Sequence, residues 1–146
     1  MKQLLSVNST SKTIDIALLV ARVGIAALML THGLPKLNML FSGGPIQFPP
    51  VMGMSPTVSL GLAVFAEVLC SIFILTGFAT RLAVVPLIVT MLVAVFAIHA
   101  ADPFTKQEAG IQYLLVYIVL LLAGSGRYSL DSILLNNKLA VSRQGI

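Results

Sequence analysis

The chain lacks most of what a soluble enzyme needs. It has no tryptophan, a single cysteine and only 10% charged residues among 146. A lone Cys70 excludes an intramolecular disulfide and any Cys-x-x-Cys redox or zinc motif. No glycine-rich phosphate loop follows a strand pattern, and no serine, histidine and acid set lies on a polar scaffold, so nucleotide and acyl-transfer chemistry are unsupported. Any redox chemistry therefore needs a bound cofactor or a partner protein.

The excess of positive charge does not indicate nucleic-acid binding. The chain carries nine basic and five acidic residues, for a net charge of +4 and a pI near 9.6. The basic residues are scattered, mostly at the ends of apolar stretches, and form no basic run with interleaved aromatic residues. We therefore predict no nucleic-acid partner. The charges are better explained as determinants of orientation in a lipid bilayer.

Long apolar stretches are what the chain has in abundance. Hydrophobic residues make up 58% of it and the mean hydropathy is +1.00, too high for a water-soluble domain of this size. Windows of about 20 residues, enough to cross roughly 30 Å of hydrocarbon, fit four times. They lie at 14–35, 57–76, 81–100 and 109–124. The sequence therefore predicts an all-α, four-helix transmembrane bundle that contacts membrane lipid.

The whole chain, 1–146, is predicted to form a single membrane domain. Residues 1–13 precede the spans, 14–124 contain the four transmembrane helices, and 125–146 form an amphipathic tail. An even number of spans returns the chain to its starting side, and most basic residues gather on that side. They are Lys2, Lys12, Arg81, Arg127, Lys138 and Arg143. We therefore expect both termini to be cytoplasmic. The first outer connection, about residues 38–56, is rich in Gly and Pro yet keeps apolar side chains, which favours a lid over a linker.

Two charges fall inside the predicted spans. At 1.5 Å per residue, Arg22 lies about 12 Å from the start of its span and Glu67 roughly 14 Å from the end of its own. Equal depth, and the high cost of an unpaired charge in hydrocarbon, predict a structural ion pair between Arg22 and Glu67. The alternative is that Glu67 is a proton-relay or ligand-binding carboxylate.

Two histidines lie near the outer ends of their spans. His32 and His99 are each about 27 Å from the inner end of their helices, so their imidazoles share one level. They could bracket a haem or bind a metal, but isolated histidines at helix ends more often bond to backbone or water, so we favour neither a haem nor a metal site. Asp102 and Lys106 lie beyond His99, where a solvated loop is the simplest interpretation.

Other polar residues complete a predicted site at the same level. Lys36 shares a helical stripe with His32, and Glu108 and Gln112 share a face at i, i+4. We predict His32 and Glu108 as catalytic proton-transferring residues, with ligand binding by Lys36, Glu67, His99 and Gln112. A polar pocket beneath an apolar lid suits an amphipathic ligand with its head at the outer side. A quinone fits that description.

Several segments together resemble the DoxX-like membrane proteins. Residues 31–37 (THGLPKL) resemble the family's first-helix signature, 67–83 its second helix and turn, and 91–99 its third helix. Residues 124–131 (GSGRYSLD) are similar to its closing motif, with Ser125 in place of the common proline, and Glu108 lies where the family often has an acid. The resemblance extends through nearly the whole chain and implies a small four-helix integral membrane protein.

The resemblance also implies a redox association. The family takes its name from a small subunit linked to a terminal quinol oxidase and to thiosulfate:quinone oxidoreduction, and other relatives are tied to thiol or oxidative-stress complexes. We therefore expect a quinone-binding membrane subunit of an oxidoreductase in the bacterial cytoplasmic (inner) membrane, with electrons from a soluble or membrane redox partner. A non-enzymatic binding or transport protein for a small lipophilic or acidic solute, and a structural assembly subunit, are the alternatives. The sequence leaves the substrate, the electron donor and the oligomeric state open.

Overall fold

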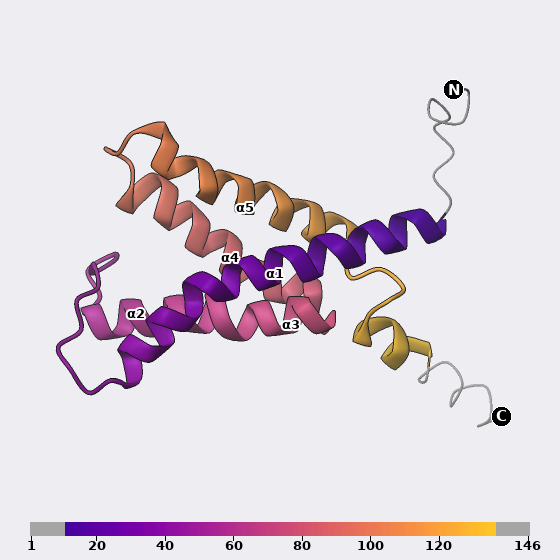
Figure 1. The fold of residues 1–146 in the computed structure, drawn as a ribbon, viewed down its shortest axis with the longest axis horizontal. Coiled ribbons are helices and arrows are strands. Elements are labelled where there is room, and N and C mark those ends of the chain that lie inside the picture. Colours follow the sequence, from indigo (N-terminus) through magenta and orange to yellow (C-terminus); the bar gives the residue numbers. More distant parts are fainter. Residues whose placement is uncertain (1–10, 137–146) are drawn as a thin grey trace.

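The computed structural model describes residues 11–136, and this part of the chain is helical, without strands (Figure 1). Four helices are long and apolar enough to cross a membrane. They are Ser11–Phe41, Pro56–Thr76, Thr80–Ile98 and Phe104–Ala123. The predicted all-α fold with four membrane spans is confirmed. The cytoplasmic placement of the termini stays a prediction.

Two of the four spans contain a π-helical segment. The first span is α1 (Ser11–Phe41) and the last is α5 (Phe104–Ala123). The second consists of α2 (Pro56–Val64), the π-helix η1 (Phe65–Cys70) and α3 (Ser71–Thr76). The third consists of α4 (Thr80–Val93) and the π-helix η2 (Ala94–Ile98). A further helix begins at residue 130 and continues to the end of the described part.

Local chemistry explains where the second span begins and ends. Ser55 has extended backbone and its hydroxyl accepts a hydrogen bond from the amide of Val58 at 3.3 Å, while Pro56 occupies the first helical position, where its missing N–H costs nothing. Gly77 ends the span in the left-handed conformation, with φ of +71°. The span is thus delimited by its own sequence.

The first and last spans are longer than the apolar windows indicate. α1 continues through Pro35 to Phe41, and α5 begins at Phe104, five residues before the predicted start. The extra turns carry polar residues such as Lys36 and Lys106, which a hydropathy window excludes from a span although they remain helical. Lys36 and Lys106 therefore lie on regular helix, which fixes the direction of their side chains.

The four spans pack around one apolar core. In Figure 1, α1 runs across α2 and α3, while α4 and α5 pack side by side. The core cluster comprises Ala26, Met29, Ala66, Cys70, Ile74, Ala83, Val84, Leu87, Met91, Tyr117 and Leu120. Gly33 allows α1 to approach η1 closely, because a Cβ there would lie only 3.0 Å from the carbonyl carbon and oxygen of Glu67. Small residues at such crossings are typical of membrane bundles.

The bundle has two chemically different ends. Residues 42–55, here called the lid, join α1 to α2 at one end, where residues 99–103 also join η2 to α5; this is the lid end (Figure 1). At the other end, the turn at 77–79 and residues 124–136 surround Arg22; this is the Arg22 end. The predicted site residues lie at the lid end.

Candidate functional site

A buried ion pair joins the first two spans near the lid end. The Nζ atom of Lys36 on α1 lies 2.5 Å from Oε1 of Glu67 on η1. Glu67 is only 2% exposed, and its other carboxylate oxygen, Oε2, is buried and has no hydrogen-bond partner within the described part of the chain. Charge-assisted bonds of this kind are the strong ones inside a protein. If Glu67 is the ligand-binding carboxylate that the sequence left as an alternative, it acts next to the ammonium group of Lys36.

The predicted ion pair between Arg22 and Glu67 is wrong. Arg22 is fully buried, and its guanidinium donates from Nη1 to the carbonyl of Ile74 at 3.0 Å and from Nη2 to the carbonyl of Tyr128 at 2.5 Å. Depth misled because the inner ends of the two spans do not share one level: Arg22, eleven residues into α1, lies beside the last turn of the second span, so α1 extends beyond that span. Backbone carbonyls, one of them in the last turn of α3, compensate its charge instead of a carboxylate.

A polar chamber of about 160 Å³ lies between the spans at the lid end. Its polar lining comprises His32, Lys36, Glu67, His99, Lys106 and Tyr113. Four predicted site residues, from α1, η1 and the end of η2, therefore meet in one cavity. The ring of His32 packs edge-on against Tyr113 of α5, with centroids 5.8 Å apart, which links the first and fourth spans across the chamber.

His99, which lines the chamber, is paired with the carboxylate of Asp102. Nδ1 of His99 lies 2.7 Å from Oδ2 of Asp102, and Nζ of Lys106 lies 3.7 Å from the same oxygen. The hydrogen bond with His99 lowers the pKa of Asp102; partial desolvation opposes this shift, and the positive charge of Lys106 supports it. Because Nδ1 is engaged, Nε2 is the ring nitrogen left to a ligand. The sequence analysis missed this role of Asp102; the i, i+3 spacing to His99 was the available signal.

Glu108 and Gln112 do not join this cluster. Both are exposed on α5, where the amide of Gln112 donates to Oε1 of Glu108 at 3.2 Å, and neither lines the polar chamber. Glu108 and Gln112 do share a helix face, as predicted. The prediction that they lie at one site with His32 and His99 is wrong. On α5, the chamber is lined instead by Lys106, Gly110 and Tyr113, since a residue two positions along a helix faces a different direction.

An apolar cavity of about 470 Å³ lies under the lid. The lid contributes Phe48, Pro49, Val51, Met52 and Met54, and α2 and α4 contribute further apolar walls. Two contacts hold the lid: the amide of Val51 donates to Oγ of Ser59 at 3.0 Å, and Nζ of Lys36 lies 5.8 Å from the centroid of the Phe48 ring. The expectation that this connection covers a site, and is no mere linker, agrees with this arrangement.

The polar chamber and the apolar cavity meet at shared residues. Lys36, Glu67, Ala94 and His99 line both, so the two spaces adjoin at these residues; together they are here called the joined cavity. Within residues 11–136, no group of three or more His, Cys, Asp and Glu side chains could hold a metal ion. The polar chamber offers hydrogen bonds and proton transfer at one end of the joined cavity, and the space under the lid offers apolar contact at the other. That combination suits a ligand with a polar head and an apolar tail.

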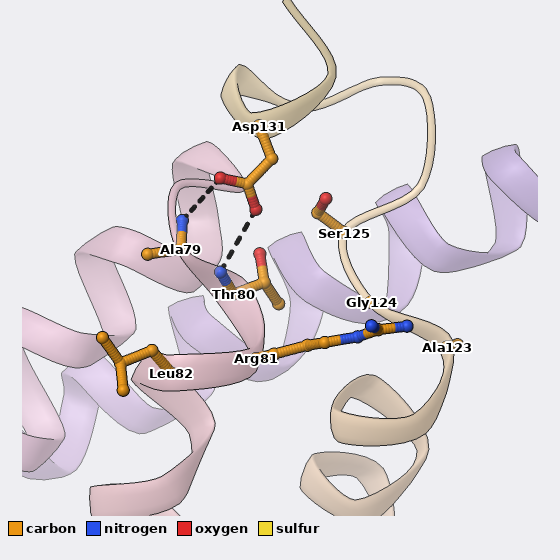
Figure 2. Close-up of a pocket in the computed structure, with 8 residues that line it drawn as sticks. All are labelled: Ala79, Thr80, Arg81, Leu82, Ala123, Gly124, Ser125 and Asp131. Carbon is orange, nitrogen blue, oxygen red and sulfur yellow. Dashed lines mark hydrogen bonds between the residues drawn. The ribbon is translucent and has the colours of Figure 1, made fainter. Parts of the chain in front are cut away.

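The closing segment, residues 124–131, builds the Arg22 end and not the joined cavity. Asp131 accepts hydrogen bonds from the amides of Ala79 at 2.7 Å and Thr80 at 3.3 Å, which satisfies the start of α4 (Figure 2). Oδ1 of Asp15 on α1 accepts a bond from the amide of Arg127 at 3.0 Å. With the Arg22 bond to Tyr128, these contacts tie the segment to the first and third spans. Its role in this structure is therefore architectural.

Comparison with known proteins agrees with this architecture at the level of family. Neither the curated proteins nor the solved structures that were compared with the chain give a match. The model of the DoxX family matches residues 17–100, which include Lys36, Glu67, Ala94 and His99 of the joined cavity. Because this match spans more than half of its length, the chain belongs to the DoxX family of membrane proteins.

Proposed function

We propose that the protein binds a quinone in the joined cavity and serves as a membrane subunit of a redox system, in the bacterial cytoplasmic membrane. The observation that carries the proposal is the sharing of Lys36, Glu67, Ala94 and His99 by a polar chamber and an apolar cavity. A quinone has carbonyl oxygens on a compact head and an apolar tail. The chamber supplies hydrogen-bond donors for the carbonyl oxygens of the head, and the space under the lid suits the apolar tail.

The residues at the junction fit the needs of such a head group. Lys36 has three N–H donors, of which Glu67 uses one, so the ammonium can also donate to a carbonyl oxygen of the head. His99 can hold or release a proton at Nε2 while Asp102 compensates the charge at Nδ1. His32, held against Tyr113, lies on the same chamber and is a second proton carrier. Glu108 has no place in this scheme.

A quinone supplies two-electron, two-proton chemistry when it is bound. The chain's own side chains offer only the proton part, so the electrons come from a partner protein of redox character. Orientation follows the earlier expectation: with cytoplasmic termini, the lid end lies in the outer leaflet. The ligand head is then near the outer surface and its tail lies among α2, α4 and the lid.

Solvent extraction and mass analysis of the protein purified in mild detergent, with its visible spectrum, test this proposal. We expect a quinone at a substantial fraction of the protein concentration in the unmodified chain and a large reduction in His99→Ala. Gln112→Ala, on the exposed face of α5, is the matched control and is expected to keep the quinone. A haem spectrum would overturn the proposal, as would quinone retained equally by both variants. A lipophilic acid in place of quinone would favour a solute-binding protein.

A further inference from the structure

We infer a second binding site, at the Arg22 end, that takes the phosphate head group of an anionic phospholipid. A cavity of about 450 Å³ lies there between the start of α4 and the end of α5. Its polar lining is Thr80, Arg81, Ser125 and Asp131. None of these residues lines the joined cavity, so this site is separate from the proposed quinone site.

The charge in this cavity comes from Arg81. Its side chain extends from α4 across the cavity toward Gly124, and Nη2 donates to the carbonyl of Leu122 at 3.1 Å (Figure 2). In the described part of the chain, Arg81 takes part in no ion pair. Its guanidinium therefore keeps donors and a full positive charge for a ligand, and a phosphate is the group that this planar fork suits best.

One further observation points to a ligand beside Arg81. Thr80 is 1% exposed, lines the cavity, and its hydroxyl has no hydrogen-bond partner among residues 11–136. Asp131 is the one carboxylate in the lining, and it accepts bonds from two backbone amides at the start of α4, where the helix dipole offsets its charge. Asp131 still disfavours a dianion such as free phosphate, whereas a phosphodiester with one negative charge beside Arg81 is acceptable.

The exposed apolar side chains around this cavity favour a lipid, and not free phosphate, as the source of the phosphate group. Leu82, which lines the cavity, and Leu122, whose carbonyl holds Arg81, are each 74% exposed on transmembrane-capable helices. An acyl chain can lie over these leucines while the phosphate contacts Arg81. The quaternary ammonium of phosphatidylcholine would meet the positive charge of Arg81, so an anionic head group such as phosphatidylglycerol is preferred.

Fluorescence quenching can measure this preference, because the chain has no tryptophan. Val119→Trp places a single reporter on the exposed face of α5, one turn from Leu122. We expect brominated phosphatidylglycerol to bind beside this reporter about fivefold more tightly than brominated phosphatidylcholine. Adding Arg81→Gln should remove the preference and Arg81→Lys should keep most of it. Arg127→Gln is the control, since the Arg127 side chain is exposed and lines no part of the cavity.

Every other outcome contradicts the inference. Equal quenching by the two lipids in the reporter protein, or a preference that survives Arg81→Gln, would overturn it. An equal loss in Arg127→Gln would show a general surface charge effect instead of a site. Abolition of the preference by inorganic phosphate at constant ionic strength would assign the cavity to a free anion and not to a lipid.

Discussion

At the scale of single residues, the two most deeply buried charges among residues 11–136, Arg22 and Glu67, serve different ends of the molecule. Glu67 is paired with Lys36 at the joined cavity, and Arg22 is bonded to backbone carbonyls at the Arg22 end. The sequence could reveal that both must be compensated, because a charge in hydrocarbon is costly. It could not reveal the partners, since long side chains and an unknown helix start leave depth uncertain by more than one turn.

A double-mutant cycle separates the two pairings. We expect Lys36→Met and Glu67→Gln to be coupled in the free energy of unfolding by between about 0.5 and 3 kcal/mol, because they remove the two sides of one contact. Arg22→Met and Glu67→Gln should be additive within about 0.5 kcal/mol, because they share no contact. Denaturant unfolding in detergent measures both cycles. Strong coupling of Arg22 with Glu67 would contradict the assigned partners.

Removing the Arg22 guanidinium should destabilise the Arg22 end. Arg22→Met removes the guanidinium donors to the carbonyls of Tyr128 and Ile74, of which Ile74 keeps its bond from the amide of Gly77, and hydrogen bonds to charged groups contribute about 1.5–3 kcal/mol each. We expect a loss of at least about 2 kcal/mol in the free energy of unfolding. The exposed Arg127→Met is the matched control and should change little. Equal stability of both variants would refute the role assigned to Arg22.

The pair formed by Asp102 and His99 should contribute to the loss of folding stability at acidic pH, here called the acid limb. The pKa of Asp102 is lower in the folded state, because His99 bonds to its carboxylate. Its contribution is therefore fully present above the ordinary aspartate pKa of about 3.9 and is lost as pH falls through the lowered value. Thermal unfolding of Asp102→Asn should lack that loss. An acid limb of equal steepness in Asp102→Asn and the unmodified protein would contradict this role of the pair.

At the scale of the elements, sequence reasoning located the four spans and missed their irregularities. Apolar windows, Ser55–Pro56 and Gly77 mark the spans, since each signal is local. The π-helices η1 and η2 have no comparable signal, yet η1 carries Glu67 and η2 carries Ala94 and precedes His99. π-helical turns occur frequently at functional sites, where they re-aim side chains. That re-aiming depends on contacts between spans, which a single sequence does not display.

The crossing of α1 over η1 can be tested with two glycines of the same helix. A Cβ at Gly33 would lie 2.8 Å from Cγ2 of Val68 and 3.0 Å from the backbone of Glu67, whereas one at Gly24 meets nothing within 4 Å. Gly33→Ala should therefore destabilise the protein and weaken quinone retention by displacing Glu67. Gly24→Ala should be neutral or stabilising by up to about 1 kcal/mol, from helix propensity alone. A neutral Gly33→Ala would contradict the close crossing.

At the scale of the whole molecule, chemistry is divided between the two ends. The lid end holds the joined cavity, and the Arg22 end holds the bonds of the closing segment and the Arg81 cavity. Grouping of His32, Lys36 and His99 was predictable from helix rise and stripes, because both imidazoles lie near one level and Lys36 shares the stripe of His32. Helix rise alone placed Glu67 at the depth of Arg22 instead. The exclusion of Glu108 was not predictable, because it depends on how α5 is rotated about its axis.

The orientation in the membrane that the basic residues predict can be tested by labelling introduced cysteines. With Cys70 replaced by serine, Met52→Cys at the lid, where Met52 is 88% exposed, should react with a membrane-impermeant thiol reagent in intact cells. A cysteine at Gln144, which lies outside the described residues, should react only after the membrane is opened. The reverse pattern would place the lid in the inner leaflet and refute the predicted cytoplasmic termini.

The central claim is tested most directly by measuring how tightly two single variants bind a quinone that carries an apolar tail. Their substituted residues lie three positions apart in η2. Ala94 lines both parts of the joined cavity, and Ala97 is exposed and lines neither. We expect Ala94→Phe to fill the junction and to weaken quinone binding at least tenfold, and Ala97→Phe to bind as the unmodified protein does. Equal affinities for all three proteins, or no measurable binding by the unmodified protein, would contradict the claim that this cavity holds a quinone.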